Sequence, residues 1–309
     1  MAHVFRTYKE FLQERFPKCK SVRKVTLDAG CTCPNLDGTK GTGGCIYCDN
    51  RSFSPALALR GQSITTQIEQ QAKRIHAKYP GAGLLAYFQP FSNTYAPLER
   101  LSQAWQEALN RPEVVGLSIG TRPDCLPNPI LELLRTTSRI KPLILEIGLQ
   151  TANDTTLNLI HRGHTVAEFT SAMNHCLALI EEEHQHGFSG FDLATHLILG
   201  LPGETSEDFL RTGRYVAQYP LCAIKIHPLH VIRGTALAKS WKDGDISLLS
   251  FEAYCQAVAM VMRELPPAIA IERFSGEAPS ESLLAPDWCG DRNAIVKRVM
   301  EILNEPSKS

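Results

Sequence analysis

Residues 191–218 read FDLATHLILGLPGETSEDFLRTGRYVAQ and contain one complete strand–turn–helix unit. Its first ten residues form a nearly continuous apolar run, which is typical of a strand covered by helices on its faces. A turn follows at 200–203, and the residues from about 206 to 218 have the spacing of an amphipathic helix. Thr205 with Asp208 three residues later is an analogue of a capping box, which predicts where that helix begins.

The same unit recurs along most of the chain. Apolar segments predict five further strands at 21–29, 83–88, 114–121, 142–148 and 222–231. Amphipathic segments between them predict helices near 63–78, 97–110 and 128–137, and helical segments up to about 186. Strands and helices that alternate in this way form a parallel sheet with right-handed crossovers. We therefore expect an α/β fold, a partial TIM-like (β/α)6 barrel.

After residue 240 the pattern loosens into a helix at 250–264, a short strand at 270–274 and a terminal helix. No linker rich in Gly, Pro or Ser separates this part from the rest. We expect three regions: a basic N-terminal helix or arm (1–20), the partial barrel (21–240), and an α-rich C-terminal extension packed on the barrel (241–309).

The formal charge of the chain is zero, but the charge is unevenly distributed. Residues 1–24 carry seven Lys and Arg against Glu10 and Glu14, a local excess of five. Such an arm could contact phosphates. The alternative is an ordinary solvated amphipathic helix, which charge patterning alone favours.

Neither a membrane span nor a signal peptide is evident in the sequence. No apolar run approaches the roughly 20 residues that a membrane span needs, and the N-terminus lacks the hydrophobic segment of a signal peptide. We therefore expect a cytoplasmic protein. In a reducing compartment the ten cysteines do not suggest disulfides, and they point to metal or redox chemistry.

Polar and glycine-containing motifs follow the predicted strands at one end of the sheet. They are residues 31–48, 89–94, 121–124, 148–151, 200–205 and 227–235. The carboxyl ends of parallel strands are where α/β barrels carry their active sites. The topology therefore predicts that these motifs form one site.

The first of these motifs, CTCPNLDGTKGTGGCIYC at 31–48, holds four cysteines. Four thiolates could close a tetrahedral, structural zinc site, as in a zinc-stapled binding module without catalysis. Alternatively, Cys33, Cys45 and Cys48 could hold three irons of a [4Fe–4S] cluster and leave the fourth iron open. Spacing leaves both open, but the position of the loop on the catalytic face favours the cluster.

Several motifs give the chain a resemblance to a known family. They are VRKVTLDAG, CPNLDGTKGTGGCIYC, YFQPFSNTYAP, TRPDCL, EIGLQTANDTTL, RGH, LILGLPGET, IKIHPLHVIRGTAL and ERFSGEAP. With them the chain resembles the radical S-adenosylmethionine (SAM) enzymes, within the YhcC-like subfamily. It is more weakly similar to the radical domain of the elongator acetyltransferase subunit, in GGCIYC, TRPD and EIGLQT.

The resemblance implies that Cys33, Cys45 and Cys48 bind a [4Fe–4S] cluster whose open iron binds SAM. The common Cys-x3-Cys-x2-Cys spacing is absent, because eleven residues separate Cys33 from Cys45, a departure shared with the elongator-like branch. Cys31 is interpreted as a spectator, since the site needs one open iron. The alternative is that Cys31 serves as a ligand when Cys33 is lost.

The resemblance also implies a set of SAM contacts. They are Tyr47 between the last two cysteines; Gln89, Ser92 and Asn93, where the family has Gly-Gly-Glu; Gln150 after the fourth strand; and Gly200, Pro202 and Gly203 after the fifth. Glu146 is less suited to this role, because an unpaired carboxylate on a hydrophobic strand is costly. The alternative for Glu146 is a structural ion pair with Arg122 or Arg162.

The catalytic residues are not identified by the sequence. His227, His230 and Arg233 after the sixth strand are candidates, although a histidine near a sheet is more often structural. Arg122 and Asp124 predict either a salt-bridged turn or a substrate contact. The cysteines at 125, 176, 222 and 255 lie in apolar segments and are interpreted as core residues.

The elongator-like resemblance and the basic arm together suggest tRNA as the partner, with modification of a nucleoside as the reaction. Enzymes that modify a base commonly extrude it from its stack. A low-potential electron donor such as flavodoxin or ferredoxin is implied by the family. A small molecule or a protein remains the alternative substrate.

Overall fold

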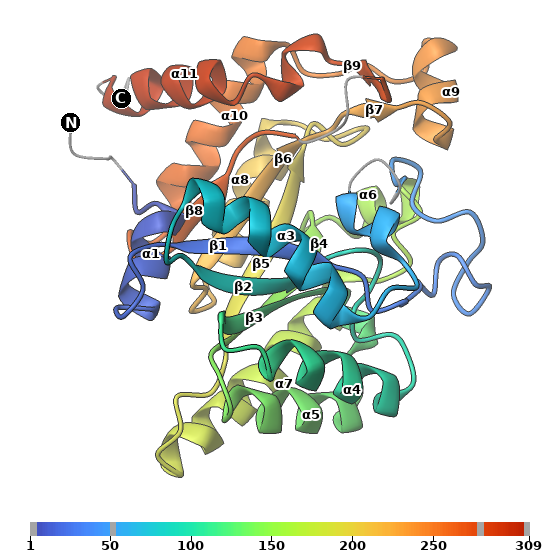
Figure 1. Ribbon diagram of the computed structural model, residues 1–309. Coiled ribbons are helices and arrows are strands. Elements are labelled where there is room, and N and C mark those ends of the chain that lie inside the picture. Colours follow the sequence, from blue (N-terminus) through green and yellow to red (C-terminus); the bar gives the residue numbers. More distant parts are fainter. Residues whose placement is uncertain (1–4, 50–53, 277–280, 306–309) are drawn as a thin grey trace.

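The computed structural model describes residues 5–49, 54–276 and 281–305, and its centre is a curled, parallel, seven-stranded sheet (Figure 1). The strands stand in the order β1 (Val22–Leu27), β2 (Gly83–Phe88), β3 (Val114–Thr121), β4 (Leu143–Gln150), β5 (Asp192–Leu199), β6 (Ala223–Pro228) and β8 (Ala270–Arg273). The predicted α/β partial barrel is confirmed. Its sheet has seven strands where six were expected, because β8 in the C-terminal part pairs in parallel with β6.

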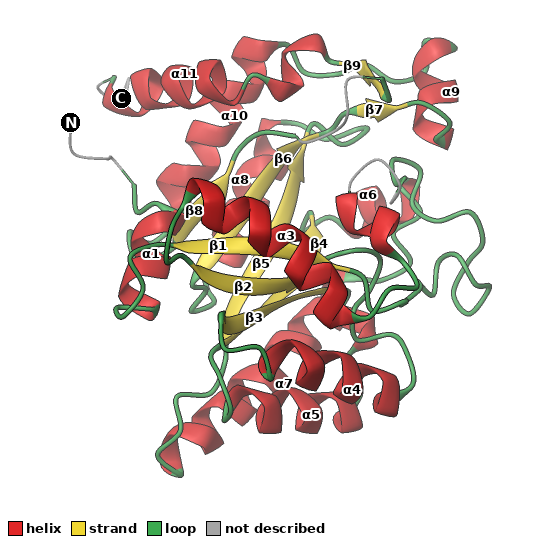
Figure 2. Ribbon diagram, in the orientation of Figure 1, coloured by secondary structure: helices red, strands yellow, loops and turns green. Residues whose placement is uncertain are grey.

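Helices cover the outer face of the sheet (Figure 2). They are α3 (Ile64–Lys78), α4 (Leu98–Leu109), α5 (Asn128–Ser138), α7 (Val166–Gln185), α8 (Ser206–Val216), α10 (Phe251–Glu264) and α11 (Arg292–Asn304). Their apolar side chains and those of the strands form the main core, in which Trp105 and Phe169 are fully buried. The short α6 (Asp154–Leu159) lies instead at the carboxyl ends of the strands, where Leu157 packs in a second cluster with Leu237. The capping box at Thr205 and Asp208 is present, as predicted.

The amino ends of the strands are closed by α1 (Tyr8–Arg15) (Figure 1). Tyr8, Phe11 and Leu12 of this helix are buried against a layer of inward-facing side chains that includes Ala194 and Ala223. Glu10 completes a capping box with Thr7. A helix therefore exists in the predicted N-terminal arm, but its apolar face fills the base of the barrel.

The basic residues near the N-terminus lie at the end of the barrel away from the strand-end loops. Arg15 pairs with Asp192 at 2.7 Å, and Arg6 pairs with Glu14. Lys24 lies inside the barrel, where Glu146 and Glu272 each lie 2.8 Å from its Nζ. The interpretation of Lys24 as part of an RNA-binding arm is therefore wrong, because two carboxylates already hold its charge.

A second, two-stranded sheet stands above the carboxyl end of β6. It pairs β7 (Val231–Ile232) with β9 (Leu283–Ala285), and α9 (Ala236–Lys242) follows β7. The Leu237 amide of α9 donates to the Ile46 carbonyl at 2.8 Å, which ties this C-terminal part to the cysteine loop. No helix in the described parts of the chain is long and apolar enough to cross a membrane.

Candidate active site

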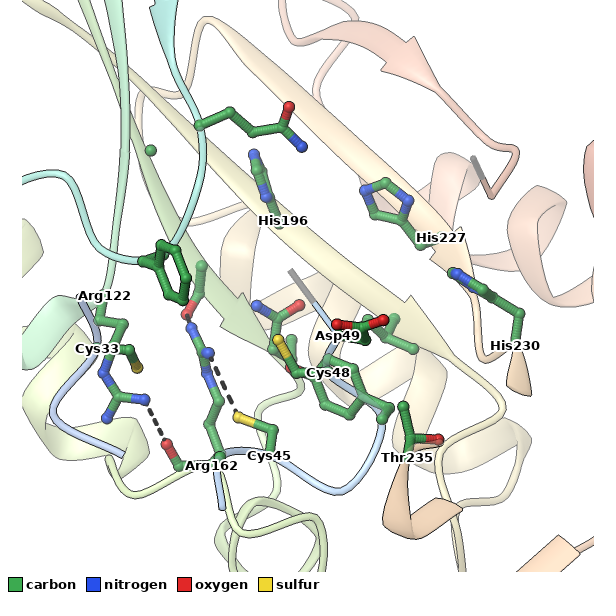
Figure 3. Close-up of a pocket in the computed structure, with 18 of the residues that line it drawn as sticks. Cys33, Cys45, Cys48, Asp49, Arg122, Arg162, His196, His227, His230 and Thr235 are labelled. Atoms are coloured by element: carbon green, nitrogen blue, oxygen red, sulfur yellow. Dashed lines mark hydrogen bonds between the residues drawn. The ribbon is translucent and has the colours of Figure 1, made fainter. Parts of the chain in front are cut away.

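A cavity of about 790 Å³ opens at the carboxyl ends of the strands. The cysteine loop, the ends of β2 to β6 and the segment that follows β6 all contribute to its wall. Cys45, His196 and Thr235, which come from distant parts of the sequence, lie around it (Figure 3). The predicted gathering is thus observed for five of the six strand-end motifs, because parallel strands bring their carboxyl ends to one edge. The motif at 200–205 contributes no residue to this cavity.

Three of the four loop cysteines line this cavity, namely Cys33, Cys45 and Cys48. Cys31 does not line it, since its side chain is 1% exposed within the main apolar core. The backbone carbonyl of Cys31 accepts a hydrogen bond from Arg60 Nη2 at 2.6 Å. The loop therefore presents three sulfurs to one space and turns the fourth away.

The Cys45 sulfur lies beside two N–H groups. Asn35 Nδ2 and Arg162 Nη1 are 3.7 and 3.8 Å from its Sγ. Asn35 also donates to the His161 carbonyl at 2.7 Å. Gly163 adopts φ +72°, and a Cβ there would lie 2.2 Å from Asn35 Oδ1, so only glycine lets the two loops approach this closely.

Arg162 is held from several sides. Its Nε donates to His164 Nε2 at 2.9 Å and its Nη2 donates to the Gly148 carbonyl at 2.9 Å. Burial and the positive charges of Arg162 and Arg122 lower the pKa of His164 to about 3, so this imidazole is neutral and can accept. Arg162 is therefore fixed beside the Cys45 sulfur.

Arg122 and Asp124 form the salt-bridged turn that was one of the two predicted interpretations. Arg122 Nε and Nη2 each lie 2.9 Å from an oxygen of Asp124. The Arg122 Nη1 donates to the Arg162 carbonyl at 2.7 Å. Arg122 nevertheless lines the cavity, so the turn carries its guanidinium to the site.

Three of the predicted SAM contacts line the cavity, namely Tyr47, Gln89 and Gln150. Gln150 has φ +77°, and the neighbouring wall residue Phe91 has φ +64°. Left-handed backbone is unfavourable for residues with a side chain, and it concentrates at functional sites. The strain coincides here with the side chains that enter the cavity.

The other predicted SAM contacts do not line the cavity. Ser92 and Asn93 are fully buried; Ser92 Oγ bonds Thr121 Oγ1 at 3.0 Å, and Asn93 Nδ2 donates to the Gly120 carbonyl at 3.2 Å. Both side chains brace the loop after β2. Gly200, Pro202 and Gly203 form the turn after β5, outside the cavity lining.

Glu146 is the centre of a buried polar layer beneath the cavity. Its carboxylate pairs with Lys225, with Lys24 Nζ at 2.8 Å and with His196 Nε2 at 2.8 Å. Ser118 Oγ donates to it at 2.5 Å. The expected structural ion pair is thus present, but with lysines in place of Arg122 or Arg162, because those arginines belong to the layer of the cysteine loop.

The catalytic candidates His227, His230 and Arg233 all line the cavity. His227 lies on β6 and His230 lies just after it (Figure 3). The His230 Nδ1 bonds the Pro228 carbonyl at 3.0 Å, which orients this ring. Several wall residues were not identified from the sequence, namely Asp49, Arg60, Tyr87, His196 and Arg273. The sequence did contain a signal for His196, because a buried histidine inside an apolar strand needs a hydrogen-bond partner.

The donor set fits an iron–sulfur cluster. The thiols of Cys33, Cys45 and Cys48 line one cavity, and burial together with the Cys45 and Cys33 sulfurs raises the pKa of the Cys48 thiol. Cysteine thiolates are the usual ligands of a [4Fe–4S] cluster.

A parallel partial barrel with three cysteines in the wall of its strand-end cavity has the fold and the ligand type of an iron–sulfur enzyme. Comparison with protein-family models matches residues 38–216 to the Radical SAM superfamily and residues 222–305 to the Radical_SAM C-terminal domain. The chain therefore belongs to the radical SAM superfamily. Enzymes of this superfamily use a [4Fe–4S] cluster and SAM, which are the cofactors of this protein.

Relatives place the chain more narrowly. It is 36% identical to the YhcC protein of Escherichia coli (strain K12), over 93% of this chain and 88% of that protein. It is 34% identical to the YtqA protein of Bacillus subtilis (strain 168), over 92% of this chain and 84% of that protein. It is 30% identical to the tRNA uridine(34) acetyltransferase of Dehalococcoides mccartyi, over 61% of this chain and 38% of that protein.

Solved structures share the fold. The archaeal Elp3 of Methanocaldococcus infernus aligns over 91% of this chain and 63% of that one, with a TM-score of 0.63 and 18% identity. Methylornithine synthase aligns over 97% and 87%, with a TM-score of 0.54 and 13% identity. At these identities the likeness concerns the fold alone.

Proposed function

We propose that Cys33, Cys45 and Cys48 bind three irons of the [4Fe–4S] cluster and that the fourth iron is left to SAM. The observation that carries this proposal is the division of the loop, which turns three sulfurs to the cavity and buries Cys31 in the core. When bound, the two cofactors supply a 5′-deoxyadenosyl radical that abstracts a hydrogen atom from the substrate.

The chain's own residues hold SAM and exclude water in this proposal. Tyr47, Gln89 and Gln150 offer polar groups at the cavity wall. Ser92 and Asn93 act indirectly, by holding Thr121 and the Gly120 carbonyl in place. We assign Gly200, Pro202 and Gly203 a supporting role in the loop after β5. Fixed dipoles of this kind stabilise a bound charged group without reorganisation.

We further infer that the substrate is a nucleoside of tRNA. The support is the similarity to tRNA uridine(34) acetyltransferase and to Elongator complex protein 3, which covers 53% of this chain for the mouse protein. A basic side chain also occurs at the cavity, where the exposed Arg233 lines the wall. The exposed Lys239 and Lys242 follow on α9, so the cavity end offers its own contacts for phosphates.

The proposed reaction needs one electron for each radical that is formed. We propose a low-potential donor such as flavodoxin or ferredoxin as the source. His227, His230 and Arg233 are proposed to contact the substrate, because they line the cavity wall that is formed by β6 and the segment after it.

The experiment is a comparison of the modified nucleosides in bulk tRNA from cells with and without the gene. We expect one nucleoside to disappear or its precursor to accumulate, and the wild-type gene, but not a Cys33→Ala gene, to restore the pattern. Identical nucleosides in both strains would reject tRNA as the substrate. In the same case, release of 5′-deoxyadenosine by the reduced enzyme would still support the radical reaction.

A further inference from the structure

His196 is a cavity residue whose hydrogen-bond partner fixes which ring nitrogen carries the proton. It lies on β5, and its Nε2 is 2.8 Å from Glu146 Oε2. Burial opposes the charge of Glu146, but the ammonium groups of Lys225 and Lys24 hold the pKa of this carboxyl well below its usual range. An ionised carboxylate can only accept. The proton of the imidazole is therefore on Nε2, and Nδ1 carries a lone pair.

The imidazole of His196 is also neutral. Burial and the Lys225 ammonium lower its pKa to about 4, so near pH 7 Nδ1 is an acceptor and not a donor. Glu146 is in turn fixed by Ser118 Oγ at 2.5 Å and by Lys24 Nζ at 2.8 Å. Glu146 is thus a positioning residue, which sets both the tautomer and the orientation of the ring.

His227 lies beside His196 on the same wall. The two ring centroids are 6.1 Å apart, and the ring planes are inclined by 60°. Burial and the charge of Arg273 hold the pKa of His227 well below the usual histidine value. Figure 3 shows both rings on the strands β5 and β6, apart from Cys33 and Cys45. This part of the wall therefore presents neutral imidazoles to the substrate.

We propose that His196 Nδ1 accepts a hydrogen bond from a ring N–H of the substrate base, so that the cavity selects uracil-type or guanine-type bases. This inference rests on the proposed nucleoside substrate and adds the class of base to it. Uracil N3 and guanine N1 carry a hydrogen, whereas cytosine N3 and adenine N1 carry a lone pair. A lone pair placed against Nδ1 would leave two buried acceptors without a donor, which a polar site rejects strongly.

The experiment compares the binding of uridine and N3-methyluridine to the anaerobic holoenzyme with SAM bound, by calorimetry or ligand-observed NMR. N3-methyluridine lacks only the ring N–H. We expect uridine to bind about tenfold more tightly or better, which corresponds to about 1.4 kcal/mol. His196→Leu should lose this discrimination, because a leucine side chain has no atom that can accept a hydrogen bond, while Lys225 and Lys24 still pair with Glu146. His184→Leu, on the exposed end of α7, is the matched control and should keep it.

Each outcome decides the matter. Equal binding of uridine and N3-methyluridine to the wild-type enzyme would overturn the inference, and so would the absence of binding by both uridine and guanosine. If His196→Leu still rejects N3-methyluridine, the methyl group is excluded by its size and the inference falls. Should His196→Leu fail to fold, ¹⁵N NMR of the wild-type histidines replaces it. A proton on His196 Nδ1, or no shift of that nitrogen with uridine, would count against the inference.

The failure of this inference differs from the failure of the proposed function. A nucleoside that changes in tRNA from cells without the gene, together with equal binding of uridine and N3-methyluridine, would reject the role of His196 alone. Unchanged tRNA together with no nucleoside binding would reject both. Changed tRNA together with discrimination that depends on His196 would support both.

Discussion

The two ends of the barrel are built from the same strands and serve opposite purposes. On β5, Ala194 packs under α1, while His196, two residues later, lines the cavity. On β6, Ala223 and His227 make the same contrast. Small apolar side chains at the amino ends leave room for the side chains of α1, and polar ones at the carboxyl ends leave a cavity. On β5 and β6, the residue that packs against α1 and the residue that lines the cavity are therefore only a few positions apart.

Between the two ends lies the ionic layer around Glu146. Lys24, Lys225 and His196 all contact this carboxylate. Breaking a buried pair by removing one partner is costly, because the other charge is left without compensation. A substitution in this layer is therefore expected to change both the orientation of His196 at the cavity and the stability of the barrel. Substitutions on either side of the layer can test the two ends separately.

The largest expected effect is at the cavity end. Cys33→Ala, Cys45→Ala or Cys48→Ala should reduce the iron content of anaerobically purified protein from about four per chain to near zero, because a cluster needs each of its thiolates. Iron analysis and the visible absorption spectrum measure this. Cys31→Ala should retain the cluster, since its side chain is buried in the core.

Loss of iron in Cys31→Ala with retention in Cys33→Ala would show that the first ligand is misassigned. Cys176→Ala is the control for a cysteine that is equally buried on α7. If this variant also lost its iron, the effect of the other substitutions would reflect general destabilisation.

The second effect is at the closed end. Phe11→Ala should lower the free energy of unfolding by about 3–5 kcal/mol, the usual cost of removing a buried aromatic side chain. Phe11 is 5% exposed beneath the barrel. Urea denaturation measures the loss, and Lys9→Ala on the exposed face of the same helix should change stability little.

The affinity for SAM should be unchanged in Phe11→Ala at temperatures where the protein stays folded. A loss of SAM binding equal to that of a cavity variant would contradict the separation of the two ends.

The elements of the cavity end could be predicted from the sequence because their signals are local. Continuous apolar runs followed by glycine and proline indicate strands and the loops at their carboxyl ends, and β-strand topology then brings 31–48 and 227–235 together. The placement of Cys33, Cys45, Cys48 and His227 at one cavity follows from this rule. It required no knowledge of any side-chain contact.

The interior of the barrel could not be predicted in this way. Lys24 and Glu146 lie 122 residues apart, and neither strand alone indicates which residue of the other it will face. The position of the N-terminal helix under the barrel could not be predicted for a related reason. Its basic residues are a local signal, whereas the fit of Phe11 under the barrel depends on small residues such as Ala194 and Ala223 on distant strands.

The third prediction concerns where RNA would bind. Neutralising Lys239 and Lys242 to Gln should weaken tRNA binding about tenfold, and it should lower the slope of log K against log salt by about one for each phosphate that the variant no longer binds. The reason is that α9 follows Thr235, which lines the cavity. Filter binding across a salt series measures both quantities.

Lys18→Gln with Lys20→Gln is the matched pair of exposed lysines near the closed end. We expect it to have the smaller effect on affinity. A larger effect there than at α9 would mean that RNA contacts the base of the barrel, and the proposed division of the two ends would fail for this partner.

The smallest expected effect is on the free energy of unfolding, through the buried carboxyl of Glu204 at the cavity end. Glu204 follows β5 and accepts a hydrogen bond from Thr151, the neighbour of the strained Gln150. Burial raises the pKa of Glu204 to about 7, and the charge of Asp208 adds to this. Because the folded state holds this proton more tightly than the unfolded state, whose glutamate pKa is about 4.3, stability falls as pH rises from about 4.5 to about 7.

Glu204→Gln should remove this loss. The side chain is partly exposed, so we expect a gain of about 1–2 kcal/mol at pH 8 and no difference near pH 4. Urea denaturation at the two pH values measures it, and Glu207→Gln on the exposed start of α8 should show no such dependence. An equal stability of Glu204→Gln and wild type at pH 8 would mean that this carboxyl does not lower stability. If the gain is found, the buried carboxyl of Glu204 lowers stability at the cavity end of the barrel, where Gln150 also has a left-handed backbone.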